Sequence, residues 1–245
     1  MEGSGAPVLE PGRLAGVDVL RGAAILQMIA FHLCYDLNHF SWIHADTLGD
    51  PAWIAWRTAI VAQFLFLVGV SLALRAQAID GPVRPNWRRW LQIAACAALV
   101  SAASRALFGP RWIWFGVLHF VALAQLLALP LARRGAAAAV LGAALVLAGW
   151  LIRIPAFADD ALSWIGFSPA KPQTEDYVPL VPWSGVVLLG VAAADLWRRR
   201  GRDLPRWRPQ GPLQLPAFLG RWPLTTYMIH QPILFGLLWL LTPAR

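Results

Sequence analysis

The stretch RLAGVDVLRGAAILQMIAFHLCYDLNHF, residues 13–40, indicates the fold class of this chain. It contains an apolar run of about 20 residues, the length that a helix needs to cross about 30 Å of hydrocarbon. Asp18, Arg21, His32 and Asp36 nevertheless lie within this run. Ionisable side chains at membrane depth are costly unless they are paired or face a watery cavity. The stretch therefore predicts a transmembrane helix, at 17–37, that carries functional polar groups.

The composition places the rest of the chain in the membrane as well. Of the 245 residues, 58% are hydrophobic and 14% are charged, and the mean hydropathy is +0.54. This leaves too little polar surface for a soluble globule. Further apolar runs predict spans at 54–75, 90–108, 112–131, 136–154, 181–197 and 224–242. We expect an all-α polytopic bundle of about seven transmembrane helices. Residues 1–16 form a cytoplasmic tail, and residues 17–245 form a single transmembrane domain.

The basic residues are divided unevenly among the loops. Fourteen of the 21 lysines and arginines lie in the N-terminal tail and in 75–89, 133–134 and 198–221, whereas six lie in the alternate loops and at the C-terminal end. Because positively charged loops stay in the cytoplasm, the pattern predicts N-in/C-out topology. The arginines punctuate apolar segments and form no single basic face, so we expect lipid, and not nucleic acid, around this chain.

Arg21 and His32 share one face of the predicted first helix. Eleven steps of about 100° make three turns plus about 20°, and the rise separates the two residues by about 16 Å. Asp18 and Asp36 continue the same face. In the predicted topology, Arg21 lies in the cytoplasmic half and His32 in the outer half. The guanidinium can clamp a phosphate or carbonyl, and the imidazole, oriented by Asp36, can act as a general base or acyl acceptor.

Simpler roles are open for the same residues. Asp18 and Arg21 can form an interfacial ion pair, while His32 and Asp36 can hydrogen-bond neighbouring helices. In the segment FLFLVGVS, the small residues Gly69 and Ser71 allow close helix packing. Two loops, 155–182 and 198–221, are longer than a connection requires. Prolines at 179 and 182 exclude a regular helix across 178–181, so we expect the first of these loops to fold over the mouth of the bundle.

Five segments, in order, carry a resemblance to a known family. They are VDVLRGAAILQMIAFHLCYDL at 17–37, FLFLVGVSLAL at 64–74, FGVLHF at 115–120, DYVPLVPWSGVVLLG at 176–190 and LTTYMIHQPIL at 224–234. The chain resembles bacterial proteins related to the catalytic domain of heparan-alpha-glucosaminide N-acetyltransferase. The spacing of Arg21 and His32 is also similar to that of acyltransferase-3 membrane proteins, which acylate sugars of the cell envelope.

The resemblance implies transmembrane acyl transfer in a bacterial inner membrane, with acetyl-CoA as the co-substrate. It implies that His32 is the catalytic histidine, as a base or a transient acetyl carrier, and that Arg21 positions the CoA end of the donor. Cys34 and Cys96 lie in separate apolar runs and show no metal-ligand spacing, so we expect no metal.

From their places on the first two spans, we add Asp36 to the catalytic residues and Asp18 and Ser71 to the donor-binding residues, since Gly69 and Ser71 can leave room for a pantetheine arm. His119 and His230 occupy other family-like segments and join the expected substrate-binding set; otherwise they are ordinary histidines of the bundle. The implied acceptor is an amine or hydroxyl of an extracytoplasmic glycan.

The chain departs from the eukaryotic enzyme, because 245 residues leave little beyond the helical bundle. We therefore do not infer for this chain the acceptor that the eukaryotic enzyme uses. A homo-oligomer is compatible with the sequence, as is a monomer. The competing hypothesis is a transporter or flippase that uses Arg21, His32 and Asp36 as a proton or anion pathway. Such proteins often show inverted repeats and broken helices in paired positions, which the sequence does not display.

Overall fold

The computed structural model describes residues 14–47, 49–201 and 208–242. The helices in these ranges are α1 (Ala15–His39), α2 (Pro51–Gln77), α3 (Trp87–Phe108), α4 (Val117–Leu127), α5 (Gly135–Leu151), α6 (Asp160–Ser163), α7 (Leu180–Arg199), α8 (Gln214–Arg221) and α9 (Pro223–Leu241). Short 3-10 turns, η1 (Gly109–Arg111), η2 (Leu129–Leu131), η3 (Pro155–Ala158) and η4 (Gly211–Leu213), lie between them. The described residues contain no strand, and the expected all-α class is confirmed.

Part of the sequence-based topology falls outside the described residues. This applies to most of the expected cytoplasmic tail, residues 1–13, and to four of the arginines in the charge count, Arg13, Arg202, Arg206 and Arg245.

Five helices of the described chain are long and apolar enough to cross a membrane: α1, α2, α3, α7 and α9. The remaining two expected spans, 112–131 and 136–154, contain the shorter helices α4, with 11 residues, and α5, with 17. α4 is short because 112–116 is irregular chain that lies beside the loop before α7; the Val178 N–H donates to the Phe115 carbonyl at 3.4 Å. Eleven helical residues cover only about 17 Å of about 30 Å of hydrocarbon. Five of the seven expected spans therefore coincide with helices whose length and composition suit a membrane crossing.

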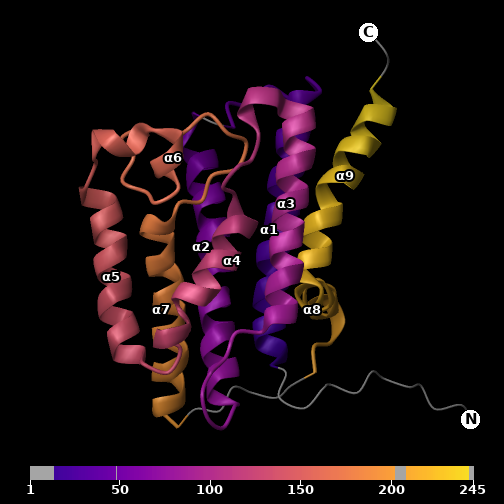
Figure 1. Ribbon diagram of the computed structural model, residues 1–245. Coiled ribbons are helices and arrows are strands. Elements are labelled where there is room, and N and C mark those ends of the chain that lie inside the picture. The colour runs from indigo at the N-terminus through magenta and orange to yellow at the C-terminus, as the bar shows by residue number, and fades with distance from the viewer. Residues whose placement is uncertain (1–13, 48, 202–207, 243–245) are drawn as a thin grey trace, which may run out of the picture.

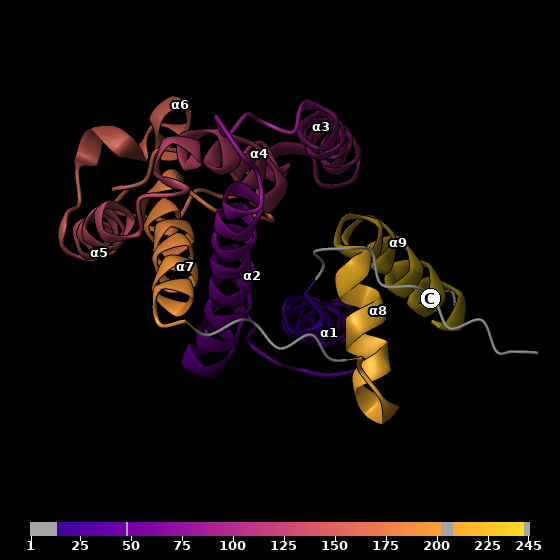
Figure 2. The ribbon, with the colours of Figure 1, turned by 90° about the horizontal axis from the view of Figure 1, so that it is seen from below.

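The helices pack around α1 and α7 (Figures 1 and 2). α7 lies between α5 and α2, and α1 contacts α2, α8 and α9. The core lies where α2, α4 and α7 meet, and it includes the fully buried Leu65, Phe120 and Val187. Contacts with these three helices therefore bury part of the α1 surface, including Asp18, Ile25 and Asp36.

α8 is a helix within the loop that the sequence predicted at 198–221. It runs across the bundle axis, since Figure 1 shows it nearly end-on and Figure 2 shows it lengthwise. A Cβ atom at Gly22 of α1 would collide with the Pro216 carbonyl, and one at Gly220 would collide with the Asp18 carbonyl. Glycines at both positions thus let the backbones of α1 and α8 touch. This contact lies at the end of α1 that carries Arg21, below called the Arg21 end; the opposite end of the bundle is the His32 end.

Candidate functional site

Arg21 is held by groups from three helices. Its Nη1 lies 2.9 Å from Oδ1 of the buried Asp18 and 3.0 Å from the Gly220 carbonyl of α8, and its Nη2 lies 2.7 Å from Ser71 Oγ of α2. The Gly220 carbonyl belongs to the last turn of α8, where carbonyls lack partners within their own helix. Ser71 in turn donates to the Leu67 carbonyl. The ion pair that the sequence offered as one role for Asp18 and Arg21 is confirmed, and Ser71 belongs to the same cluster.

His32 contacts a second histidine that lies 198 positions away in the chain. Its Nδ1 is 2.9 Å from Nε2 of His230 on α9, and the ring centroids are 4.9 Å apart. Nδ1 of His230 lies 2.7 Å from the Tyr227 carbonyl. His230 is buried, while His32 is partly buried and packs nearly perpendicular to the Phe31 ring. Two of the sequence-predicted site residues, His32 and His230, are thus brought together.

Asp36 lies one turn beyond His32 and is fully buried, with 1% of its surface exposed. Its Oδ1 accepts a hydrogen bond from Gln231 Nε2 at 2.8 Å. The other oxygens of both groups, Asp36 Oδ2 and Gln231 Oε1, have no hydrogen-bond partner among the described residues. The expected bond from Asp36 to His32 is not among the hydrogen bonds of these residues, because Gln231 and His230 bind the two groups separately. Sequence reasoning did not single out Gln231, although it directly follows His230 on α9.

The loop before α7 reaches α1 at the His32 end. Glu175 Oε2 accepts from the Tyr35 hydroxyl at 3.1 Å, and Glu175 Oε1 lies 3.3 Å from Arg111 Nη1. Asp176 Oδ2 accepts from the N–H of Val117, the first residue of α4, at 2.8 Å. A carboxylate is favourable there because the N-terminal end of a helix carries partial positive charge. The expectation that this loop folds over one end of the bundle is confirmed.

His119 lies apart from the α1 cluster. Its Nδ1 accepts from the Gly116 N–H at 3.3 Å, so Nε2 carries the proton of the neutral ring and donates to Ser101 Oγ at 3.0 Å. Ser101 then donates to the Ile113 carbonyl. Both ring nitrogens are therefore engaged where α3 meets the chain before α4. Among the described residues, no group of three or more His, Cys, Asp or Glu side chains is placed to hold a metal ion.

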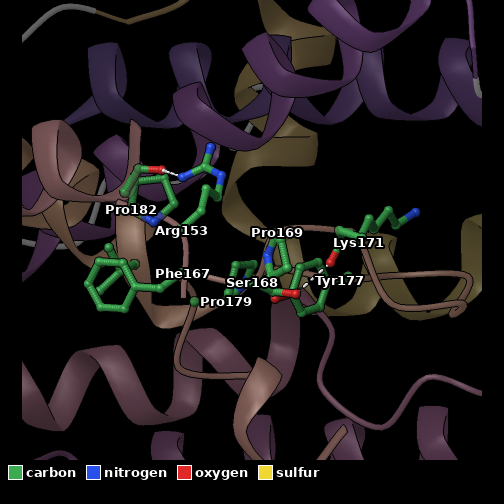
Figure 3. A pocket seen from close by; sticks show the side chains of 12 residues that line it. Arg153, Phe167, Ser168, Pro169, Lys171, Tyr177, Pro179 and Pro182 are labelled. Carbon is green, nitrogen blue, oxygen red and sulfur yellow. Dashed lines mark hydrogen bonds between the residues drawn. The ribbon is translucent and has the colours of Figure 1, made fainter. Parts of the chain in front are cut away.

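An open cavity of about 270 Å³ lies at the His32 end, between the end of α5, residues 166–171 and the start of α7 (Figure 3). Its lining includes Arg153, Lys171 and Tyr177. The Tyr177 hydroxyl donates to the Ser163 carbonyl at 2.7 Å, and burial raises the pKa of Tyr177 to about 12, so the phenol is protonated at neutral pH. Figure 3 shows Arg153 and Lys171 on different sides of the cavity. The two cations do not converge, and the lining contains none of the sequence-predicted site residues.

Comparison with known proteins identifies one family. The model of the family "Heparan-alpha-glucosaminide N-acetyltransferase, catalytic" matches residues 13–232, which cover α1 and extend to the segment of α9 that holds His230. No curated protein and no solved structure matches the chain. The match spans far more than half of the sequence, and the family is one of membrane acetyltransferases. With its long apolar helices, the chain is an integral membrane protein that belongs to the heparan-alpha-glucosaminide N-acetyltransferase catalytic-domain family.

Proposed function

We propose that this protein is a membrane-bound acyltransferase that passes an acetyl group from cytosolic acetyl-CoA to an amine or hydroxyl of an extracytoplasmic glycan. The observation that carries the proposal is the placement of Arg21 and His32 on one helix, about 16 Å apart along its axis. Each is fixed by groups from other helices, Arg21 by α2 and α8 and His32 by α9. Two different polar groups are thus positioned at two depths of the same helix.

In this proposal Arg21 binds the donor. A guanidinium stays charged at every relevant pH and offers several N–H donors to a carbonyl or a phosphate. The hydrogen bonds that it donates to Asp18 and Ser71 hold it at the Arg21 end of α1. The phosphates of CoA then meet the basic residues around the start of α3, Arg84, Arg88 and Arg89.

His32 performs the transfer at its own end of the helix. A neutral imidazole can remove a proton from an amine or hydroxyl acceptor as it attacks the acetyl carbonyl, or it can carry the acetyl group transiently. His230 and Asp36 belong to the same polar region between α1 and α9. The acceptor enters beside the Glu175 loop, which lies over this end.

The proposed topology has seven crossings, with the Arg21 end in the cytoplasm and the His32 end outside a bacterial inner membrane. The excess of arginine at the Arg21 end supports this orientation. α5 covers about 25 Å and packs along α7, so a modest thinning of the bilayer accommodates it. α4 needs the irregular chain before it to complete a crossing, and such chain is tolerated at membrane depth where protein surrounds it.

The decisive experiment uses the full chain in proteoliposomes supplied with acetyl-CoA labelled in the acetyl group. D-glucosamine and D-glucose serve as the amine and hydroxyl probes, and CoA release, label in the sugar and label in the protein are measured. Replacing the general base, His32→Ala, is expected to lower transfer at least about 100-fold. Arg21→Ala removes charge-assisted hydrogen bonds to the donor and is expected to raise the KM for acetyl-CoA about tenfold or more.

His39→Ala is the matched control, because His39 is an exposed histidine in the last turn of the same helix. Its transfer rate should equal that of the wild type. Undiminished transfer by His32→Ala contradicts the assigned mechanism. If the wild-type protein does not bind CoA, the proposal is wrong. The competing hypothesis, a transporter or flippase with a proton or anion pathway, is then favoured.

A further inference from the structure

The contact between His32 and His230 is the middle of a hydrogen-bond chain whose direction can be worked out. The chain runs from the Tyr227 carbonyl to His230 Nδ1 at 2.7 Å, and from His230 Nε2 to His32 Nδ1 at 2.9 Å. A backbone carbonyl can only accept a hydrogen bond, so Nδ1 of His230 must carry a proton. The direction of the remaining bond follows from this starting point.

A neutral imidazole has one N–H donor and one acceptor nitrogen. Because Nδ1 of the buried His230 donates, its Nε2 is the acceptor, and the proton between the two rings belongs to Nδ1 of His32. We infer that His230 is a positioning residue that fixes His32 in the tautomer protonated at Nδ1. The unprotonated nitrogen of His32 is then Nε2, and the lone pair available for chemistry lies on that atom.

The geometry around both rings supports a fixed arrangement. The planes of the two histidine rings meet at 41° with centroids 4.9 Å apart, and the rings of Phe31 and His32 pack edge to face with centroids 6.0 Å apart. Tyr227, which supplies the carbonyl, also packs its own ring against His230, with centroids 5.8 Å apart. A free histidine samples both tautomers, so a buried acceptor on one side selects one of them.

The consequence for chemistry, which rests on the proposed function, is a base that accepts a proton without rearranging its neighbours. As the acceptor attacks, the acetyl carbon forms a C–N or C–O bond to it and its C–S bond to CoA breaks; the sulfur keeps the electron pair until His32 passes it a proton at the end of the reaction, so that CoA leaves as the thiol. During the attack the N–H or O–H bond of the acceptor breaks and an N–H bond forms at Nε2 of His32. His32 is then an imidazolium whose Nδ1–H still donates to His230, and His230 still donates to the Tyr227 carbonyl. His230 thereby supports the charged ring in the way that the third member of a catalytic triad does.

The direct test is NMR of the full chain in detergent, labelled with 15N-histidine, using long-range 1H–15N correlations that distinguish protonated from bare ring nitrogens. Assignment uses single replacement of each of the five histidines. We expect Nδ1 protonated and Nε2 bare for both His32 and His230 in the wild type. A wild-type His32 protonated at Nε2 and bare at Nδ1 overturns the inference, whether or not the protein transfers acetyl groups.

Two variants at position 230 distinguish the effect of the hydrogen-bond acceptor from the effect of side-chain volume. His230→Leu has no acceptor, and it should shift His32 toward the Nε2-protonated tautomer and lower kcat by about 100- to 10,000-fold at unchanged KM for acetyl-CoA. His230→Gln keeps an oxygen able to accept from His32 Nδ1, and it should retain the Nδ1–H signal and recover most of kcat. Equal loss of the signal in both variants, or its survival in a folded His230→Leu protein, contradicts the positioning role.

The failure of this inference is distinguishable from failure of the proposed function. If the protein transfers no acetyl group and yet shows the assigned tautomers, the proposed function is wrong, but the inference that His230 fixes the tautomer of His32 is correct. If transfer depends on His32 but the tautomers are reversed, the function stands and the positioning role is wrong.

Discussion

A hydrogen bond between Asp36 and Gln231 joins α1 to α9, the same two helices that the His32–His230 contact joins. Gln231 Nε2 donates to Asp36 Oδ1 at 2.8 Å, between α1 and α9. Both residues are next to histidines of the pair, since Asp36 is four positions after His32 and Gln231 directly follows His230. Two polar contacts therefore join α1 and α9 within a short stretch of both helices. Buried polar contacts of this kind also require that each partner be present.

Removing the amide while leaving the carboxylate should therefore destabilise the fold. In Gln231→Leu, the buried carboxylate of Asp36 loses its donor, and we expect the free energy of unfolding to fall by about 1–3 kcal/mol. The measurement is denaturant-induced unfolding in detergent. The double variant with Asp36→Leu, in which neither polar group is left behind, should be less destabilised than the sum of the single variants.

Gln63→Leu is the matched control for this prediction. Gln63 accepts from Gln27 at 3.0 Å, also between two helices, but that contact is exposed. Its loss should change the free energy of unfolding by less than about 0.5 kcal/mol. Equal effects at Gln63 and Gln231 would mean that burial does not strengthen the Asp36 contact.

The loop before α7 should depend more on Tyr35 than on Arg111. Both bind Glu175, but the Arg111 side chain is 59% exposed, and exposed ion pairs contribute only about 0–1 kcal/mol. The Tyr35 hydroxyl donates to the same carboxylate in a partly buried contact, and hydrogen bonds to charged groups contribute about 1.5–3 kcal/mol. Hydrogen–deuterium exchange of residues 168–178 should therefore rise more in Tyr35→Phe than in Arg111→Ala. The reverse order would show that the ion pair anchors the loop.

The long helices could be predicted because their apolar runs are continuous, and α1 was placed to within about two residues at each end. α8 was not expected, since it is eight residues long, follows prolines and lies in an arginine-rich loop. The length of α4 was overestimated because tertiary pairing with the loop before α7 keeps 112–116 out of the helix. Helical spacing could place Arg21 and His32 on one face. It could not show that His32 meets His230, or that Asp36 meets Gln231, because those partners are set by how α9 packs on α1.

Neighbouring arginines at the start of α5 should differ sharply in their contribution to stability. Arg133 donates to the carbonyl of Ala76 in the last turn of α2, where carbonyls lack helical partners, and to the carbonyls of Ile79 and Gly81 just beyond that helix. Arg133→Ala should lower the free energy of unfolding by about 1–3 kcal/mol. Arg134→Ala removes the same charge from the adjacent position and should cost less than about 0.5 kcal/mol. If the two variants are equally stable, the hydrogen bonds of Arg133 to the end of α2 do not stabilise the fold, and the positive charge of this loop affects only the membrane topology.

The contact between α1 and α8 gives the sharpest steric prediction. A methyl group at Gly22 would collide with the Pro216 carbonyl, which is backbone and cannot swing aside, so Gly22→Ala must push α8 away from α1. We expect a loss of about 1–3 kcal/mol in the free energy of unfolding, and separation of Arg21 from the Gly220 carbonyl. Gly236→Ala on α9 adds the same methyl group where nothing lies within 4 Å, and it should leave stability unchanged or slightly improved. Paired cysteines that report the α1–α8 distance by spectroscopy would check the displacement directly. A Gly22→Ala protein as stable as Gly236→Ala, with the distance unaltered, would show that the two backbones do not touch at this point.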